Sequence, residues 1–158
     1  YLIDGFLLST VSLATDSERK RNSNPRKIYP ADLALIKAFD ASGRTQVGHA
    51  LETAVMNELD RRGAEVGYVK TNDALEVDFL ARGRTGQEEL IQVCADVSNA
   101  ATLERELRAL ASAAKEHRRA TKRLLVLDRD AQAGVRNPDC EVQPVYEWLL
   151  ATRTPSDT

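Results

Sequence analysis

The feature that most constrains the fold is a run of three strand-like segments enclosed by two long helical patterns. Residues 65–70, 75–81 and 88–97 are rich in β-branched and apolar side chains, and only short turns containing Asn, Asp or Gly separate them. Short turns join antiparallel neighbours, because a parallel pair needs a crossover of about a dozen residues. The three segments therefore predict an antiparallel meander.

A helix is predicted before this meander, over residues 47–62, and it stops at Gly63, a common C-terminal signal. Its apolar stripe consists of Leu51, Val55 and Leu59. Glu52 belongs to the same stripe, where a carboxylate costs desolvation unless it is paired or binds a metal ion. Alternatively, Glu52 lies at the edge of the stripe and reaches water, and the sequence leaves both interpretations open.

A second amphipathic helix is predicted after the meander, over residues 100–118, with Ser98 or Asn99 as its N-cap. Its apolar stripe consists of Leu103, Leu107, Leu110 and Ala114. The next segment, 122–128, is almost entirely apolar, which is typical of a strand buried on both faces. This order predicts an α/β sandwich with a mixed central sheet, made of the meander plus further strands, between flanking helices.

The two ends of the chain give weaker patterns. Residues 6–13 predict a strand, residues 15–27 an exposed, mobile loop, and residues 27–40 a short strand followed by a short helix. Residues 141–150 predict an edge strand that stops near Pro144, followed by a short helix. Because the chain opens at Tyr1 inside an apolar run, we interpret it as a fragment of a longer protein.

Composition excludes several classes of protein. The chain has 158 residues, of which 42% are hydrophobic and 29% charged, so it can fold as one domain around a core. The net charge of −2 gives no overall nucleic-acid signature. Cys94 and Cys140 lack metal-type spacing and suggest reduced thiols in a cytoplasmic protein. No run of about 18 apolar residues predicts a membrane span.

Polar groups alternate along two neighbouring strands in the stretch "LEVDFLARGRTGQEELIQVCAD", residues 75–96. Glu76 and Asp78 are two apart on the first strand, and Gln92 and Cys94 are two apart on the second. Strand residues two apart share a face, so each strand aims a pair of polar or reactive groups one way. A carboxylate followed by an acceptor-X-base triplet is the pattern of many nuclease metal sites, although a cysteine is not the expected base.

Together with Glu52 on the first helix, Asp78 and the Gln92-X-Cys94 triplet resemble the PD-(D/E)XK nuclease superfamily. More narrowly, the pattern "GHALETAVMNELDRRG…VKTNDALEVDF…ELIQVCAD…LERELRAL…RLLVLD" is similar to the uncharacterised C-terminal domain attached to a class of prokaryotic AAA ATPases. The preceding "YLIDGFLL" resembles the tail of the winged-helix-like linker in that family. The resemblance implies a restriction-endonuclease-like sandwich over residues 25–158, preceded over residues 1–24 by the linker tail and a mobile basic loop.

The resemblance also implies a chemistry. Cleavage of a phosphodiester with Mg²⁺ uses hard oxygen ligands, which the family assigns to Glu52, Asp78 and Gln92. The amide of Gln92 keeps an oxygen but lacks a charge, so we expect Mg²⁺ binding to be weak or absent. Cys94 stands where the family has a lysine that offsets developing negative charge, and a thiol is never cationic.

Another basic residue could replace the missing lysine. Lys70 is the first candidate, because it lies on the neighbouring strand just before the turn into the motif strand. Lys115 and Arg108, on the helix that follows, are further candidates. The alternative for all three is a solvated surface side chain.

Two basic segments suggest a nucleic-acid partner. Residues 18–27 and 115–123 each contain five Lys or Arg against one Glu, and such clusters can contact the phosphates of DNA or RNA. The alternative is a solvated loop and a basic helix C-terminus that favours the helix dipole.

Three functions follow from these observations. The first is a catalytically degenerate nuclease-fold domain that binds nucleic acid or protein for an ATPase module upstream in the same chain. The second is an active Mg²⁺-dependent nuclease with a migrated lysine. The third is an assembly scaffold for the ATPase without nucleic-acid contact. The missing lysine and the Gln92 substitution favour the first.

Overall fold

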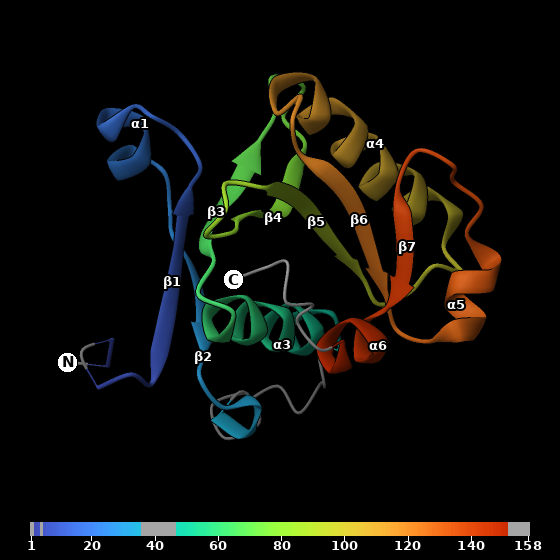
Figure 1. Ribbon diagram of the computed structural model, residues 1–158, viewed down its shortest axis with the longest axis horizontal. Coiled ribbons are helices and arrows are strands. Elements are labelled where there is room, and N and C mark those ends of the chain that lie inside the picture. Colours follow the sequence, from blue (N-terminus) through green and yellow to red (C-terminus); the bar gives the residue numbers. More distant parts are fainter. Residues whose placement is uncertain (1, 4, 36–46, 152–158) are drawn as a thin grey trace.

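The computed structural model describes residues 2–3, 5–35 and 47–151, and within them a seven-stranded mixed sheet lies between helices (Figure 1). The strands are β1 (Leu8–Leu13), β2 (Lys27–Pro30), β3 (Glu65–Lys70), β4 (Glu76–Arg82), β5 (Glu88–Cys94), β6 (Thr121–Val126) and β7 (Glu141–Pro144). The helices are α1 (Glu18–Ser23), α3 (Val47–Arg61), α4 (Ala100–Glu116), α5 (Arg129–Gly134) and α6 (Val145–Leu150). The predicted α/β fold with a mixed sheet flanked by helices is confirmed.

The sheet has the order β2-β1-β3-β4-β5-β6-β7. Strands β3, β4 and β5 pair antiparallel, as their short turns predict. Strand β6 pairs in parallel with both β5 and β7, and α4 forms the crossover from β5 to β6. On the other side of the meander, β1 pairs in parallel with β3 and antiparallel with β2.

Helices α3 and α4 cover opposite faces of the sheet (Figure 1). The α3 cluster includes Val55, Met56, Leu59, Phe79, Ile91 and Leu125. The α4 cluster includes Ala109, Leu110, Val77, Leu80, Leu90 and Leu124. Strand β6 contributes to both clusters, because its consecutive residues Leu124 and Leu125 point to opposite faces of the sheet and are each 0% exposed. Each predicted helix stripe therefore buries against its own face of the sheet.

An extra residue in β4 breaks the strict alternation of its side chains. The register shifts between Gly67, which pairs with Leu80, and Val69, which pairs with Val77. Between these two pairs, β4 has one residue more than β3. Such an extra residue is a β-bulge, which bends the strand and changes the direction of its side chains. Val77 and Leu80 consequently share the α4 face, and Asp78 lies inside the bulge.

The N-terminal region differs from the sequence-based expectation. Residues 18–23 form helix α1 instead of a loop, with the Ser17 side chain accepting a hydrogen bond from the backbone N–H of Lys20. No residue of α1 is buried, so the helix lacks the apolar stripe by which the sequence could have revealed it. Strand β1 forms part of the sheet and buries Val11 and Leu13, so the sheet begins before residue 25.

Other boundaries are close to the predicted ones. Helix α4 begins after Asn99, whose side chain caps it by accepting from the N–H of Thr102. Strand β5 ends at Cys94 instead of residue 97. Most of the helix predicted after β2 falls in 36–46, outside the described residues.

Both edge strands of the described sheet are short. Strands β2 and β7 have four residues each, and each ends in a proline, Pro30 and Pro144. Among the described helices, none combines the length and the apolar character needed to cross a membrane.

Candidate functional site

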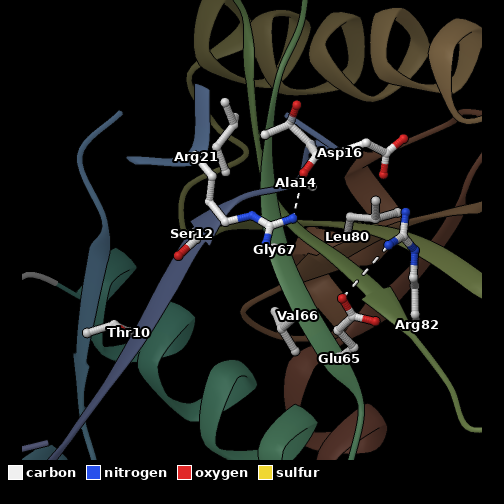
Figure 2. Close-up of a pocket in the computed structure, with 12 residues that line it drawn as sticks. Thr10, Ser12, Ala14, Asp16, Arg21, Glu65, Val66, Gly67, Leu80 and Arg82 are labelled. Atoms are coloured by element: carbon white, nitrogen blue, oxygen red, sulfur yellow. Dashed lines mark hydrogen bonds and ion pairs between the residues drawn. The ribbon is translucent and has the colours of Figure 1, made fainter. Parts of the chain in front are cut away.

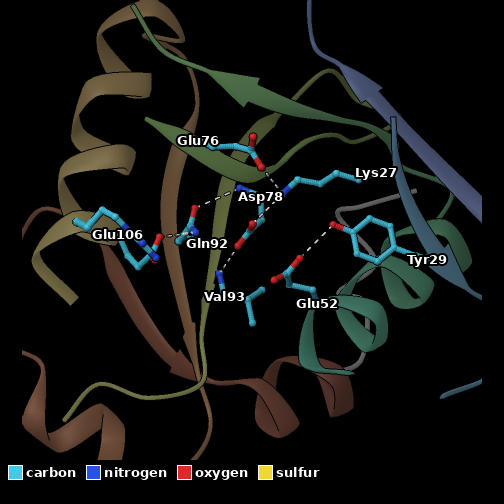
Figure 3. A network of polar contacts seen from close by, with 9 residues as sticks. Lys27, Tyr29, Glu52, Glu76, Asp78, Gln92, Val93 and Glu106 are labelled. Carbon is cyan, nitrogen blue, oxygen red and sulfur yellow. Dashed lines mark hydrogen bonds and ion pairs between the residues drawn. The ribbon is translucent and has the colours of Figure 1, made fainter. Parts of the chain in front are cut away.

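A cavity of about 330 Å³ brings together residues of α3, β4, β5 and α4. Its lining includes three predicted site residues, Glu52, Asp78 and Gln92. The other lining residues are Ala74, Leu75, Glu76, Val93, Arg105, Glu106 and Ala109. The fold thus gathers the predicted acceptor groups at one place, beside the β4 bulge (Figure 3).

Asp78 is the most enclosed carboxylate of this cavity, with 7% of its surface exposed. Its Oδ1 accepts a hydrogen bond from Lys27 Nζ at 3.0 Å, and its Oδ2 accepts one from the backbone N–H of Val93 at 3.1 Å (Figure 3). Burial raises the pKa of Asp78 above its usual range, although the charge of Lys27 opposes that rise. Each carboxylate oxygen already has a donor from within the protein.

Gln92 is 4% exposed and makes hydrogen bonds with both ends of its side-chain amide. Its Oε1 accepts from the backbone N–H of Asp78 at 3.1 Å, and its Nε2 donates to Glu106 Oε2 at 2.7 Å. Arg105 in turn donates to the other oxygen of Glu106. Gln92 therefore links β4 to α4, and its oxygen is used inside the protein.

Glu52 reaches the cavity from α3 and accepts a hydrogen bond from the hydroxyl of Tyr29 at 3.2 Å. Burial and the nearby charge of Asp78 raise the pKa of Glu52 to about 7, and the charge of Lys27 opposes the shift. Of the two interpretations open from the sequence, a paired carboxylate describes Glu52 better than one that simply reaches water. Tyr29 was not among the predicted site residues.

Lys27 is the second residue that sequence reasoning missed. Its Nζ lies 2.8 Å from Glu76 Oε1 and 3.0 Å from Asp78 Oδ1, and it also lies 5.7 Å from the centre of the Tyr68 ring. Burial lowers the pKa of Lys27, but Asp78 and Glu76 outweigh this effect and hold it above the ordinary value. The sequence does indicate that Lys27 and Tyr29 share a face of their strand, because residues two apart on a strand point the same way.

Cys94 lies outside the residues that line the cavity. It is 3% exposed and belongs to the α4 cluster, together with Leu90 and Val126. Its thiol donates to the carbonyl of Asp96 at 3.4 Å, and burial raises the pKa of that thiol. In the described structure this position serves packing.

The predicted migrated bases lie outside the cavity lining as well. Lys70 is exposed, donates to Asn24 Oδ1 at 3.4 Å and lies 5.8 Å from the centre of the Tyr68 ring. Lys115 and Arg108 are also exposed. Among the described residues, the lysine that forms ion pairs with Glu76 and Asp78 is Lys27, which lies where the predicted loop (15–27) meets the predicted short strand that follows it.

The donor set does not fit a divalent cation in this arrangement. Mg²⁺ needs several open oxygen ligands in near-octahedral geometry. Both oxygens of Asp78 and the amide oxygen of Gln92 accept hydrogen bonds from the protein. Within the described ranges, no three His, Cys, Asp or Glu side chains are placed to share an ion.

A second cavity, of about 230 Å³, lies where β1 and β3 diverge (Figure 2). Arg21 from α1 and Arg82 from β4 reach it from opposite sides, and Arg21 donates to the carbonyl of Thr15 at 2.7 Å. Arg82 is paired with Glu88 at 2.6 Å. No predicted catalytic residue lines this cavity, but Arg21 belongs to the basic segment 18–27.

The two basic segments lie toward the same end of the molecule (Figure 1). The turn between β3 and β4 contacts both. On one side Lys70 donates to Asn24, and on the other the backbone N–H of Asn72 donates to Glu116 at 3.3 Å. Residues 70–72 therefore lie between two basic segments that are about 90 residues apart in the sequence, and we call the two segments together with Lys70 the basic rim.

No protein-family model matches the chain, and no curated protein or solved structure is significantly similar to it. The cavity, its hydrogen bonds and the sequence pattern are therefore the basis on which a function is assigned.

Proposed function

We propose that this chain is a restriction-endonuclease-like domain of the PD-(D/E)XK type whose catalytic site is degenerate. In this proposal it binds nucleic acid for an AAA-type ATPase module of the same chain. The arrangement of the cavity supports it, because Glu52 comes from the helix before the meander while Asp78 and Gln92 come from adjacent antiparallel strands. The association with an ATPase depends on the sequence resemblance alone.

The observation that carries the proposal is that Gln92 and Cys94, the two residues that depart from the family pattern, both have structural roles. Gln92, at the position of a metal-binding carboxylate, has hydrogen bonds at both ends of its amide. Cys94, at the position of the lysine, is buried among apolar side chains. Loss of one electrostatic donor to the transition state typically slows catalysis by about 10²–10³. A weaker metal site would add to this loss, although effects on the same atoms need not be additive.

A cleavage assay tests the proposed loss of catalysis. The chain is incubated with single- and double-stranded DNA and with RNA, in the presence of Mg²⁺ or Mn²⁺, beside an Asp78→Asn variant. We expect no cleavage above the variant's background. Cleavage by the wild-type chain that Asp78→Asn abolishes would overturn the degenerate site, because a contaminating nuclease would act equally in both samples.

The basic rim supports nucleic acid as the bound partner. Arg19 and Arg26 from the first segment and Arg118 and Arg119 from the second are exposed. Lys70 lies between the two segments. Phosphate contacts by such residues release counterions, so the affinity should fall steeply as salt rises.

Binding is best measured with fluorescent DNA and RNA over a salt series. The double variant Arg19→Ser with Arg118→Ser removes one charge from each segment. A control that removes one charge elsewhere is Arg84→Ser, an exposed arginine in the turn at the other end of β4. We expect weaker binding and a salt slope shallower by about one for each lost phosphate contact in the double variant only. No binding at low salt would favour the scaffold without nucleic-acid contact.

A second candidate function is an active nuclease with a migrated lysine, and one observation favours it. Lys27 Nζ lies 3.0 Å from Asp78 Oδ1, so an ammonium group is close to the candidate carboxylates. If the wild-type chain cleaves nucleic acid, Lys27→Ala should abolish cleavage and Lys70→Ala should not.

A further inference from the structure

The turn that leads into strand β1 exposes several large apolar side chains. They are Leu2 at 57%, Ile3 at 52%, Phe6 at 86% and Leu7 at 46% exposed. Two backbone hydrogen bonds close the turn, from the N–H of Phe6 to the carbonyl of Ile3 at 2.9 Å and from the N–H of Leu7 to that of Leu2 at 3.0 Å. Residues 2–3 therefore lie against residues 6–7, and the four side chains form one apolar surface.

This surface continues along the ribbon formed by β1 and β2. The N–H of Ala31 donates to the carbonyl of Leu7 at 2.9 Å, and the next pair along the ribbon, Leu8 and Pro30, is apolar as well. Ile28 lies two residues before Pro30 on the same strand and is 56% exposed. We call these exposed residues the Phe6 patch: Leu2, Ile3, Phe6, Leu7 and Ile28.

The backbone of Phe6 gives an independent reason to assign a partner to this patch. Its φ is +56°, in the left-handed region that is strained for a bulky side chain. The same residue exposes 86% of its surface to water. A strained backbone that presents an aromatic ring to water is unfavourable for an isolated chain, whereas burial of that ring against a partner offsets the strain. Aromatic anchors of this kind dominate the energetics of many protein interfaces.

The charges around the patch decide which partner it fits. The described residues 2–3, 5–13 and 28–31 include no Asp, Glu, Lys or Arg. Next to them on β2, Lys27 is engaged by two carboxylates, and Asp32 on the other side is acidic. Nucleic acid and anionic lipid both need exposed cations, which these residues do not provide. An uncharged patch meets an identical patch without like-charge repulsion, so a second copy of the chain fits it.

The size of the patch is sufficient for such a pairing. A half-exposed Leu or Ile contributes about 60–100 Å² and an exposed Phe up to about 200 Å², so the patch exposes on the order of 500 Å². Two patches placed face to face would remove about 1,000 Å² from water, which is the size at which specific interfaces begin. The expected association is therefore specific but of modest affinity.

We propose that two copies of this chain associate through the Phe6 patch, with the Phe6 ring of each copy buried against the other. This dimer goes beyond the proposed function and does not depend on it. Strand β1 begins beside the patch and ends toward α1, which belongs to the basic rim (Figure 1). Paired copies therefore leave both basic rims open to a further partner.

Sedimentation equilibrium measures the association between about 1 µM and about 100 µM. The wild-type chain is compared with Phe6→Glu and Ile28→Glu, which place a carboxylate in the patch. The matched control is Leu150→Glu, because Leu150 is also apolar, is 78% exposed and ends helix α6. We expect a wild-type dimer with a micromolar Kd, and a Kd at least about tenfold higher in both patch variants. Leu150→Glu should behave like the wild-type chain.

Two further measurements make the comparison specific. Phe6→Ser removes the ring without adding a charge and should also weaken the dimer. Higher NaCl should leave the wild-type Kd unchanged or lower it, because an apolar interface is not screened by salt. Since Phe6 and Ile28 are exposed, circular dichroism should show that their variants remain folded.

Three results would overturn the inference. One is a wild-type chain that stays monomeric over the whole concentration range. Another is a dimer that persists in folded Phe6→Glu and Ile28→Glu, because association would then use a different surface. The third is a dimer that Leu150→Glu weakens as much as Phe6→Glu does, because added charge alone would then explain the effect.

Discussion

The hydroxyl of Tyr29 donates a hydrogen bond to Glu52 Oε2 across 3.2 Å, and this contact joins strand β2 to helix α3 at the candidate site. Tyr29 is 1% exposed and packs against the rings of His49 and Phe79. The phenol is therefore held in place by its neighbours, and the carboxylate it meets is partly removed from water.

The first prediction concerns pH. Burial and Asp78 raise the pKa of Glu52 from 4.5 to about 7, so between these values the folded protein binds a proton that the unfolded chain has lost. The stabilisation from this proton is fully present below pH 4.5 and is lost as the pH rises to about 7. Glu52→Gln has no such proton to lose. The melting temperature of the variant minus that of the wild type should therefore increase as the pH rises from 5 to 8. Parallel stability profiles for the two chains would contradict this.

The second prediction concerns Gln92 and Glu106. Gln92→Glu would place a second carboxylate against Glu106, where Gln92 Nε2 now donates at 2.7 Å. We expect a loss on the order of 2–4 kcal/mol in the free energy of unfolding, since a buried donor is replaced by a like charge. Adding Glu106→Gln exchanges donor and acceptor and should recover most of that loss. Urea denaturation of both single variants and the double variant measures the coupling, and simple additivity would argue against it.

The third prediction concerns Cys94, where the family pattern has a lysine. Cys94→Lys would bury an ammonium group among the apolar side chains of the α4 cluster, so we expect it to destabilise the fold by several kcal/mol. Cys94→Ala should cost only about 1 kcal/mol, the transfer and packing value of a small group. The denaturant midpoints of Cys94→Lys and Cys94→Ala measure this difference in stability. A Cys94→Lys chain as stable as Cys94→Ala would show that the side chain can reach water or the cavity.

The fourth prediction concerns the junction of β1 and β3. A Cβ added at Gly67 would lie 2.8 Å from the Cβ of Ala14, so Gly67→Ala should destabilise the chain by about 1–3 kcal/mol through overpacking. Among the described residues, no neighbouring atom lies within 4 Å of a Cβ added at Gly48, in α3, so Gly48→Ala should be neutral or stabilising by up to about 1 kcal/mol. The melting temperatures of the two variants should therefore move in opposite directions or differ clearly in size.

Local patterns were sufficient to predict the meander and the two covering helices. Short turns identify antiparallel neighbours, and the stripes of α3 and α4 do bury against opposite faces. These signals depend on residues close together in sequence, so a single chain contains them. The cap at Asn99 and the stop at Gly63, whose φ is +68°, are local in the same sense.

The contacts around the cavity could not be predicted from such local patterns. The Lys27–Asp78 contact spans 51 positions of sequence, and no local pattern indicates that β2 and β4 approach each other through their side chains. The bulge in β4 is equally hidden, since one extra residue in a strand changes which face a side chain occupies without altering composition. Proximity in sequence favours Lys70 as the migrated lysine, whereas Lys27 lies near the motif in space.

The prolines at the ends of β2 and β7 bear on how copies of this domain can associate. A proline has no N–H to donate to a neighbouring strand, and a four-residue edge leaves few main-chain groups open. As far as the described residues extend, neither edge is a good template for adding a strand from a second molecule. Self-association would then proceed through side-chain surfaces, and concentrated solutions of the folded domain should resist fibril growth by edge-to-edge pairing.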